Sequence, residues 1–496
     1  MMARMRLRAS LSRAGLVAAL GVFGLAAIPA VLTASAPPVT DVDIWWVAAA
    51  GRRMLAEHAV PRTNGFSFVD GDVPWVMHEW VFGPPYAAGL ERWGPRFFLA
   101  VGLASCLAVL ALLLAGTIGR VRHRLAGALL ALLGLLCFDG RLGDVRPLGV
   151  AILFPMAVAL LCFTEELTRA RVVMLVACEW IWANAHGSFP LGLALLGAST
   201  LAYPGQRRRR VLTLGAAAAA TLINPYGLRL HALVAGYVLG SDGVYAVIRK
   251  AIIEFLPLWQ VPGFTATATL VGLALLALAA LALAALKPTR VHGLTMLAFL
   301  ALGVLHCRNI EVCGLTALLV LGSAADRALD LSVASTSPAL GRRSLLLLAA
   351  PAALGLVAFA RRPSAPAGAW VSDELGGAAL FDLVPNLPDH ARVFAPFVTS
   401  GLAIWLGDRR GARVLYDARN DPYRPETAWD ALTLDNPQPA KVVAARFDKY
   451  GVEQALAKDG TWLARDLASL PAWRTLRRTD GWTAYARVEQ PATVQP

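Results

Sequence analysis

Apolar residues along the chain occur in long runs that are separated by short polar segments. Eleven of these runs approach the roughly 20 residues that a helix needs to cross a hydrocarbon core about 30 Å thick. They lie at 14–36, 96–118, 125–139, 147–165, 172–186, 188–203, 211–224, 263–286, 292–306, 310–325 and 344–360. The stretch 228–258 is less apolar and is better interpreted as an interfacial or re-entrant segment. The pattern predicts an α-helical polytopic membrane protein with about eleven transmembrane helices.

Two polar segments are long enough to fold outside these helices: a first loop, residues 37–95, and a tail, residues 363–496. The tail follows a linker rich in Pro and Ala and is far less apolar than the rest of the chain. Its patterns predict strands at 391–394, 412–416 and 482–488 and helices at 441–457 and 461–469. We therefore expect a transmembrane domain over 1–362 that carries the first loop, and a soluble extracytoplasmic α/β domain over 363–496.

The composition agrees with a membrane protein. Of the 496 residues, 57% are hydrophobic and 16% are charged, whereas soluble domains average roughly 45–50% and about 25%. This excludes a disordered chain, a collagen-like chain and a disulfide scaffold, and it argues against an ordinary cytoplasmic enzyme. We expect no structural disulfide and no zinc site, because all six cysteines lie in or beside apolar runs. They are Cys106, Cys137, Cys162, Cys178, Cys307 and Cys313.

The net charge of +13 would suggest a nucleic-acid partner in a soluble protein, but its distribution indicates membrane topology instead. With a cytoplasmic N-terminus, the inner segments contain 18 of the 46 Lys and Arg residues and net +14, and the rest of the chain nets −1. Positive charge on cytoplasmic segments is the rule for membrane proteins. We therefore expect a multi-pass protein with an outer tail and no nucleic-acid partner. The run at 14–36 also resembles a signal peptide, but it is long for one, and we expect it to remain as an anchor.

Unusual polar residues gather at the predicted outer ends of the helices. Ionisable groups at membrane depth are costly and tend to face a cavity, a partner or a pathway, so we expect these residues to line one outward-opening pocket. The candidates are Asp41, Asp43, Trp45, Trp46, His78, Glu79, Arg141, Arg146, Asn184, His186, Asn224, Glu254, His306 and Arg308. Each also has a purely structural interpretation: the tryptophans could form an interfacial belt, the charges could pair with one another, and Asn224 could simply end a helix.

Several short motifs in this set resemble GT-C-type glycosyltransferases. The segment 43–55 is similar to their first extracytoplasmic loop, in which an acidic residue follows the first transmembrane helix and an Arg-x-Met-Leu-like stretch follows about ten residues later. His-Glu-Trp at 78–80, Trp-Ala-Asn-x-His-Gly at 182–187, Asn-Pro-x-Gly at 224–227 and Asp-x-Arg-x-Asp-x-Tyr at 417–423 resemble a bacterial branch of that superfamily. Better-known members often have adjacent Asp and Glu, whereas here Asp41 and Asp43 are separated by one residue.

The resemblance implies an integral enzyme of a bacterial cytoplasmic membrane that moves a sugar, with inversion, from a polyprenyl-phosphate donor to an extracytoplasmic glycan, lipid or protein acceptor. Asp43, or Asp41, would be the base that takes the acceptor's proton. Cationic groups would stabilise the departing phosphate: Arg141, Arg146, His306 and Arg308. The residues left to bind or support the substrate would be Trp45, Trp46, His78, Glu79, Asn184, His186, Asn224 and Glu254. A divalent cation, Mg or Mn, on Asp41 and Asp43 stays open, as does the oligomeric state.

Two other classes of protein stay open at this point. A transporter or flippase for a lipid-linked or small polar substrate would place charges at mid-membrane depth on broken helices. A non-catalytic membrane scaffold would bind a partner through the tail. The candidate residues lie at one end of the predicted helices, which favours chemistry at the membrane surface over both alternatives.

Overall fold

The computed structural model describes most of the chain, in separate segments. These are residues 2–34, 38–119, 124–137, 145–240, 243–251, 256–257, 260, 290–305, 318, 348–362, 365–434 and 436–488. The fold is mostly helical with one small sheet. It separates into two compact units, each built from three segments of the chain. Unit 1 comprises Met1–Ala36, Leu99–Gly227 and Ile252–Arg362, and unit 2 comprises Pro37–Phe98, Leu228–Ala251 and Pro363–Pro496.

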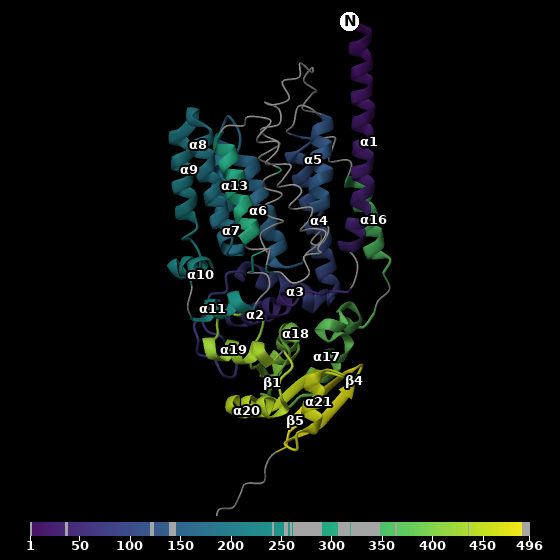
Figure 1. The fold of residues 1–496 in the computed structure, drawn as a ribbon, viewed down its shortest axis with the longest axis vertical. Coiled ribbons are helices and arrows are strands. Elements are labelled where there is room, and N and C mark those ends of the chain that lie inside the picture. Colours follow the sequence, from purple (N-terminus) through teal and green to yellow (C-terminus); the bar gives the residue numbers. More distant parts are fainter. Residues whose placement is uncertain are drawn as a thin grey trace, which may run out of the picture. The chain divides into compact units, whose positions relative to one another are not determined.

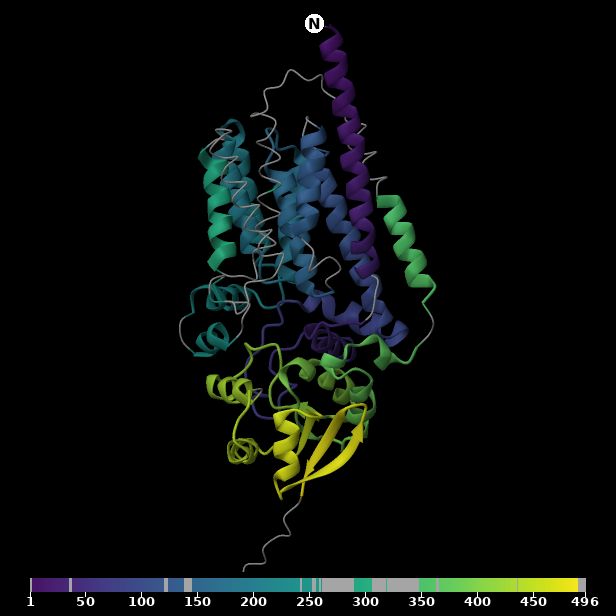
Figure 2. The same ribbon diagram turned by 45° about the vertical axis from the view of Figure 1, so that its right-hand side comes forward.

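Unit 1 is a bundle of helices that run alongside one another (Figures 1 and 2). The helices are α1 (Met2–Ala34), α4 (Arg96–Gly116), α5 (Arg124–Cys137), α6 (Pro147–Cys162), α7 (Arg169–Ala185), α8 (Pro190–Ala202), α9 (Arg207–Ala220), α13 (Arg290–Leu305) and α16 (Ala349–Ala360). Each coincides with one of the predicted apolar runs. The predicted run 263–286 lies outside the described residues, and the run 310–325 is described only at Leu318.

Two of the described helices are both long and apolar enough to cross a membrane, namely Val17–Ala34 within α1 and Arg96–Gly116. Shorter apolar helices are Ile152–Cys162, Pro190–Ala202, Leu228–Leu239 and Ala349–Ala360. The helical character of the apolar runs that the structure describes is therefore established. The number of membrane crossings stays a prediction.

One arginine of the basic run at 207–210 has a clear structural role within unit 1. The side chain of Arg210 is buried and donates to the backbone carbonyls of Cys162, at 2.7 Å, and Thr164. These carbonyls lie at and just beyond the end of α6, where the helix leaves backbone acceptors without intrahelical partners. The guanidinium also lies 4.5 Å from the ring centre of Tyr203. Arg210 thus completes the end of a neighbouring helix.

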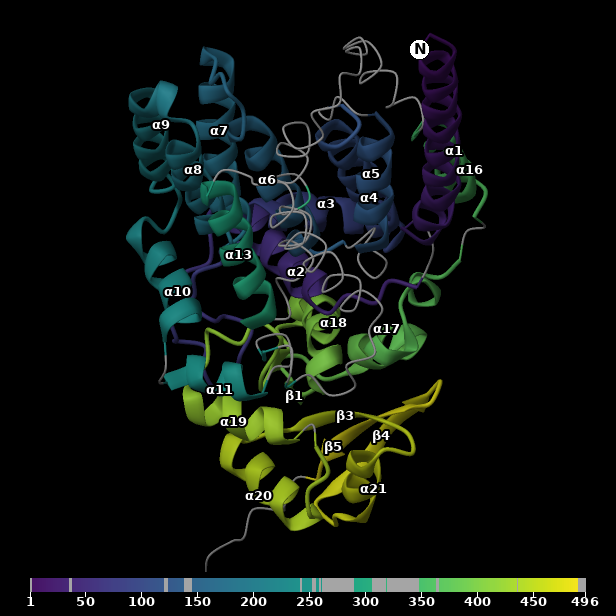
Figure 3. The ribbon, with the colours of Figure 1, turned by 45° about the horizontal axis from the view of Figure 1, so that its top comes forward.

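Unit 2 contains a five-stranded sheet with the order β2-β1-β3-β5-β4 (Figures 1 and 3). Its strands are β1 (Arg392–Phe394), β2 (Arg413–Val414), β3 (Gln454–Lys458), β4 (Trp473–Thr479) and β5 (Trp482–Arg487). Strand β1 pairs in parallel with β2 and β3, and β5 pairs antiparallel with β3 and β4. The β4–β5 hairpin turns at Asp480 and Gly481, both with positive φ, as a two-residue hairpin loop requires.

All three segments of unit 2 contribute helices. They are α2 (Asp43–Glu57), α3 (Gly83–Trp93), α10 (Leu228–Leu239), α11 (Gly243–Ala251), α17 (Gly377–Leu383), α18 (Phe397–Gly407), α19 (Pro425–Leu434), α20 (Ala440–Tyr450) and α21 (Trp462–Ser469). Strands β3 and β5 are buried along almost their whole length, so helices cover both faces of the sheet. Helix α21 packs on β3 and β4, and α17 packs on β4 and β5.

The tail agrees in part with its predicted elements. The strands near 391–394, 412–416 and 482–488 and the helix at 461–469 are present. The predicted helix 441–457 is wrong over its last part, because α20 ends at Tyr450, Gly451 follows in the left-handed conformation, and 454–458 forms β3. Strand β4 was not predicted. Its residues are mostly exposed and rich in Arg, so they lack the apolar alternation that marks a half-buried strand.

The first loop is joined to the tail by backbone hydrogen bonds. Val39 forms a parallel bridge with Val371, through Val39 N to Trp370 O at 2.7 Å and Ser372 N to Val39 O at 3.0 Å. Ser67 forms a second bridge with Val414 of β2. The predicted domain boundaries put the loop with the transmembrane part, whereas the structure groups residues 37–98 with the tail.

Candidate functional site

The two carboxylates of the first loop begin helix α2 but occupy different environments. Asp41 is buried, and its Oδ1 accepts hydrogen bonds from the backbone nitrogens of Asp43, at 2.8 Å, and Ile44, at 3.1 Å. An aspartate that accepts from the first free N–H groups of a helix is an N-terminal cap. The side chain of Asp41 therefore has a defined structural role at the start of α2.

Asp43 is the first residue of α2 and is half-buried. Its Oδ1 accepts a hydrogen bond of 3.1 Å from the indole Nε1 of Trp46, one helical turn later. The position also places the carboxylate at the positive end of the helix dipole, which favours its charged form. Asp43 is thus a carboxylate whose orientation is set by a neighbouring indole.

The aromatic residues of the loop divide into a core position and an ordered pair. Trp45 is fully buried and packs edge-on against Phe98, with ring centres 5.6 Å apart. Trp46 packs edge-on against Trp75 at 5.9 Å, and both are buried. Trp75 also packs against Phe66 at 6.3 Å. Trp46, Trp75 and Phe66 thus form an aromatic cluster of the loop, which contacts Asp43 through Trp46.

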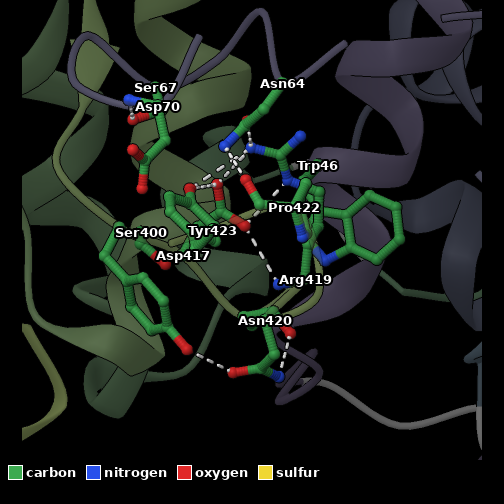
Figure 4. A network of polar contacts seen from close by, with 12 residues as sticks. Trp46, Asn64, Ser67, Asp70, Ser400, Asp417, Arg419, Asn420, Pro422 and Tyr423 are labelled. Atoms are coloured by element: carbon green, nitrogen blue, oxygen red, sulfur yellow. Dashed lines mark hydrogen bonds and ion pairs between the residues drawn. The ribbon is translucent and has the colours of Figure 1, made fainter. Parts of the chain in front are cut away.

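A buried polar network joins this cluster to the tail (Figure 4). Arg419 donates from Nε to Asp417 Oδ1 at 2.8 Å and from Nη2 to Asp417 Oδ2 at 2.6 Å, and neither side chain is exposed. The hydroxyl of Tyr423 donates to the same Oδ2 at 2.6 Å. Arg419 Nη2 also donates to Asn64 Oδ1 of the loop, and Asn64 Nδ2 donates to the Pro422 carbonyl at 2.8 Å. The network fixes residues 417–423 to the first loop.

The electrostatics of the network follow from its burial. Burial by itself would lower the pKa of Arg419, but Asp417 and Tyr423 beside it raise that pKa above the usual value. Burial and the nearby Asp417 also raise the pKa of Tyr423 well above its usual value. Arg419 is therefore charged and Tyr423 neutral at physiological pH, and Arg419 forms a buried ion pair with Asp417.

The same guanidinium reaches the aromatic cluster of the loop. The Cζ atom of Arg419 lies 4.5 Å from the ring centre of Trp75 and 5.1 Å from that of Phe66. A cation over an aromatic face is attracted by the ring quadrupole. A continuous line of contacts therefore runs from Asp417 through Arg419, Trp75 and Trp46 to Asp43.

A second polar group within unit 2 contains predicted residues of the loop. His78 Nε2 and Glu79 Oε1 are 3.5 Å apart. Asp421 of the tail accepts a hydrogen bond of 3.3 Å from the hydroxyl of Tyr237 in α10. Burial raises the pKa of Asp421 to about 6, although the nearby His78 and Arg419 lower it. Residues of all three segments of unit 2 thus take part in the electrostatics around Asp421.

The predicted residues of unit 1 have local partners of their own. Asn184 donates to the carbonyls of Trp180, at 2.9 Å, and Ile223, at 3.0 Å, which brings it beside the turn that contains Asn224. Asn224 Oδ1 accepts from Tyr226 N at 2.8 Å, as in a turn that ends a helix. His186 Nδ1 lies 2.8 Å from Ser188 Oγ. Arg146 is half-buried and directly precedes α6. Arg141, Glu254, His306 and Arg308 lie outside the described residues.

Sequence reasoning missed Asn64 and the network residues of the tail as members of this site. The stretch 417–423 was noticed only as part of a resemblance. An available signal was the close spacing of Asp417, Arg419 and Tyr423, three polar residues within one turn-forming stretch. That they meet Asn64, 355 residues earlier, could not be deduced from spacing.

The donor set at Asp41 and Asp43 does not by itself complete a cation site. Hard divalent cations take six or more oxygen ligands. Oδ1 of Asp41 is occupied by two N–H donors and Oδ1 of Asp43 by an indole. Within the described part of the chain, these two carboxylates do not assemble with a third His, Cys, Asp or Glu side chain into a group that could hold a metal ion.

Comparisons with known proteins identify the fold. The structure of ArnT from Cupriavidus metallidurans bound to undecaprenyl phosphate is similar, with 14% sequence identity and a TM-score of 0.52; the alignment covers 95% of this chain and 98% of ArnT. The structure of ArnT in the apo state has 15% sequence identity and a TM-score of 0.51, and the alignment covers 94% of this chain and 97% of ArnT. The Archaeoglobus fulgidus oligosaccharyltransferase has 11% sequence identity, and its alignment covers 89% of this chain and 69% of the oligosaccharyltransferase. Its TM-score of 0.46 is too low to support an argument about the fold. No protein-family model matches the chain, and no curated protein sequence does.

The chain has the GT-C fold. ArnT belongs to the GT-C superfamily of glycosyltransferases, and its structure aligns along almost the whole of both chains. The family resemblance noted from the short motifs is therefore confirmed for the fold. At this sequence identity the similarity establishes architecture, and activity must be argued from the site.

Proposed function

We propose that this protein is an integral-membrane glycosyltransferase that moves a sugar from a polyprenyl-phosphate donor to an acceptor outside the cytoplasmic membrane. Two observations support this. The fold matches ArnT, which has been crystallised with undecaprenyl phosphate. The observation that carries the proposal is the geometry at the start of α2, where Asp43 is half-buried, hydrogen-bonded by Trp46 and backed by the aromatic cluster.

Asp43 is the proposed base, and Asp41 is the residue that caps the helix. The capping bonds use Asp41 Oδ1 to hold two backbone N–H groups, and the side chain is buried. A group with that role is poorly placed to accept a proton from a substrate. Asp43 has one indole donor on Oδ1, and general bases of this kind must lie within hydrogen-bond reach of the proton they take.

The proposed reaction is a single displacement. The acceptor oxygen forms a bond to the anomeric carbon while the bond from that carbon to the phosphate oxygen breaks. The electron pair of the broken bond leaves with the lipid phosphate, and Asp43 takes the acceptor's proton. Attack on the side opposite the leaving group inverts the anomeric centre.

The leaving phosphate requires fixed positive charge, because negative charge develops on it as the bond breaks. The candidates are Arg141, Arg146, His306 and Arg308. The other predicted residues would orient the sugar or the acceptor: His78, Glu79, Asn184, His186, Asn224 and Glu254. A divalent cation, Mg or Mn, at Asp41 and Asp43 stays a prediction, and no step of this mechanism is routed through it.

In this proposal the N-terminus is cytoplasmic, and the first loop and the tail lie on the outer face. The positive charge on the inner segments supports this orientation. The bonds of Val39 and Ser67 to the tail support a single outer unit rather than a loop and a separate domain.

The test compares two matched substitutions in the purified protein. Asp43→Asn removes the base, and the rate of sugar transfer from a polyprenyl-phosphate sugar should fall by about 10²–10⁴-fold. Asp41→Asn is the control, because asparagine caps a helix as well as aspartate does, so most of the activity should remain. Mass spectrometry of lipid that copurifies with the protein would identify the donor. Undiminished transfer by Asp43→Asn would contradict the proposed base.

A further inference from the structure

We infer that Arg419 is a positioning residue for Asp43, acting through Trp75 and Trp46. The inference rests on the proposed function, in which Asp43 takes the proton of the acceptor. It assigns to the tail a part in the transfer reaction, namely fixing the orientation of a carboxylate in the first loop.

Arg419 is held rigidly from the tail side. Asp417 binds it at two points, at 2.8 and 2.6 Å, and its own backbone N–H donates to Asp417 Oδ1 at 2.9 Å. Bidentate pairs of arginine and carboxylate fix both position and plane. The turn is further fixed by Asn420, which has a φ of 64° and whose amide contacts Ala418 O and the Tyr416 hydroxyl. The guanidinium therefore has a single position.

Trp75 transmits that position to the first loop. The guanidinium lies 4.5 Å from the centre of the Trp75 ring, and Trp75 is almost fully buried between Phe66 and Trp46. A large ring that is packed on three sides has one available rotamer, because protein interiors are close-packed. Removal of Arg419 would leave space beside Trp75 in which the ring could shift.

Trp46 contacts both Trp75 and Asp43, so the packing of its ring sets the orientation of the Asp43 carboxylate. Its ring lies edge-on to Trp75 at 5.9 Å, and its Nε1 donates to Asp43 Oδ1 at 3.1 Å. A shift of the Trp46 ring moves the donor and changes the rotation of the Asp43 carboxylate. Displacement reactions depend steeply on the alignment of the reacting groups, so a small misplacement is costly.

A second arginine of the tail provides the matched control. Arg424 also binds the first loop, through Asp70 at 2.5 Å and Asp72 at 2.7 Å. Its side chain is half-exposed, and no contact between Arg424 and the aromatic cluster is found among the described residues. Arg424→Lys weakens the attachment of loop to tail without touching Trp75. A general role in joining the two segments would make both arginines equivalent, whereas the positioning role applies to Arg419 alone.

The experiment measures kcat, the KM for the lipid donor and the pH–rate profile of the full-length protein. Trp46→Phe keeps an aromatic ring at this position but removes the N–H, so kcat should fall by about 10-fold or more. The acidic limb of the profile should move to higher pH, because the donor that favoured the charged carboxylate is lost. Arg419→Lys should reproduce both changes with little change in KM. The double variant should lose no more than Trp46→Phe alone, because the two residues act in series.

Three results would overturn the inference. One is an Arg419→Lys variant that loses activity with an unmoved pH profile. Another is a double variant in which the two losses multiply. The third is a profile for Arg424→Lys that moves as far as that of Arg419→Lys. If Arg419→Lys fails to fold, Trp75→Leu breaks the same line of contacts and decides the matter by the same profile. Failure of the proposed function is distinguishable, because it requires Asp43→Asn to remain active.

Discussion

The contacts inside unit 1 differ in kind from the contacts inside unit 2. In unit 1 the described helices coincide with apolar runs that are continuous in the sequence, such as α4 and α8. In unit 2 the decisive contacts join residues that are far apart, such as Arg419 and Asn64, 355 positions from each other. The proposed base, Asp43, lies in unit 2. Its geometry therefore depends on a fold assembled from three separate segments.

The largest stability effect should come from breaking the buried ion pair. Asp417→Ala leaves Arg419 as a buried charge without its partner, which costs about 3–5 kcal/mol. We expect faster hydrogen exchange in residues 60–76 and 412–424 and unchanged exchange in α6–α8 of unit 1. Replacing both residues, as Asp417→Leu with Arg419→Met, should recover much of the loss. Equal exchange increases in both units would mean that unit 2 does not depend on this pair.

The next effect is a pH dependence that is confined to unit 2. The folded pKa of Asp421, about 6, is higher than the roughly 3.9 of an unfolded aspartate. The folded state therefore binds more protons between these values, and stability falls as pH rises through them. Asp421→Asn should raise the free energy of unfolding by about 1–3 kcal/mol at pH 7.5 and leave it nearly unchanged below about pH 3, where the carboxyl is protonated in both states.

The pKa of Asp430 is shifted in the direction opposite to that of Asp421, so Asp430 serves as its control. Burial works against its charged form, but the ammonium of Lys449 and the hydroxyl of Tyr450 hold the pKa of Asp430 below its usual value. Its contribution is present above the unfolded pKa and is lost as pH falls through the folded one. Asp430→Asn should therefore destabilise unit 2 at pH 7.5 and lose that effect in acid. Matching signs for the two variants would contradict the assignment.

A third prediction concerns the packing of the tail against the start of α2. A Cβ added at Gly401 of α18 would lie 2.3 Å from the carbonyl oxygen of Val42, the residue before Asp43. Gly401→Ala should cost about 1–3 kcal/mol through overpacking and should lower transfer activity by displacing Asp43. Val398→Ala, at an exposed position of the same helix, should change stability by less than about 0.5 kcal/mol. Similar effects of both variants on activity would exclude this specific contact.

The smallest expected effect comes from the half-exposed junction of loop and tail. Arg424→Lys keeps the charge beside Asp70 and Asp72 but loses the two-pronged geometry. Exposed ion pairs contribute little to stability, and added salt should reduce the difference from the unchanged protein. A loss of stability as large as that of Asp417→Ala would contradict the expectation that the buried Asp417–Arg419 pair contributes more than the exposed pairs of Arg424.

The errors at the sequence level occurred where local pattern and tertiary setting disagree. Residues 454–458 are rich in Ala, which favours a helix, yet they form β3 because β1 and β5 pair on either side. Strand β4 has few apolar residues and was missed, although the Asp480-Gly481 turn that follows it was a readable hairpin signal. In both cases the pairing partner, rather than the segment itself, fixes the conformation.

The site shows the same division. Asp41 and Asp43 were identified as a pair from their place after an apolar run, but the pattern could not distinguish them. The structure does so, because one caps the helix and the other accepts from Trp46. The convergence of the remaining predicted residues on one outward pocket stays a prediction.

The sequence by itself determined the helical runs, the two polar segments and the asymmetry of charge, because hydrophobic length and charge position are local properties of the chain. Only the tertiary structure decided that the first loop and the tail fold as one unit and that Arg419 lies behind the proposed base. Those contacts depend on closing loops of hundreds of residues. Their partners are chosen by packing and burial, which no spacing in the sequence records.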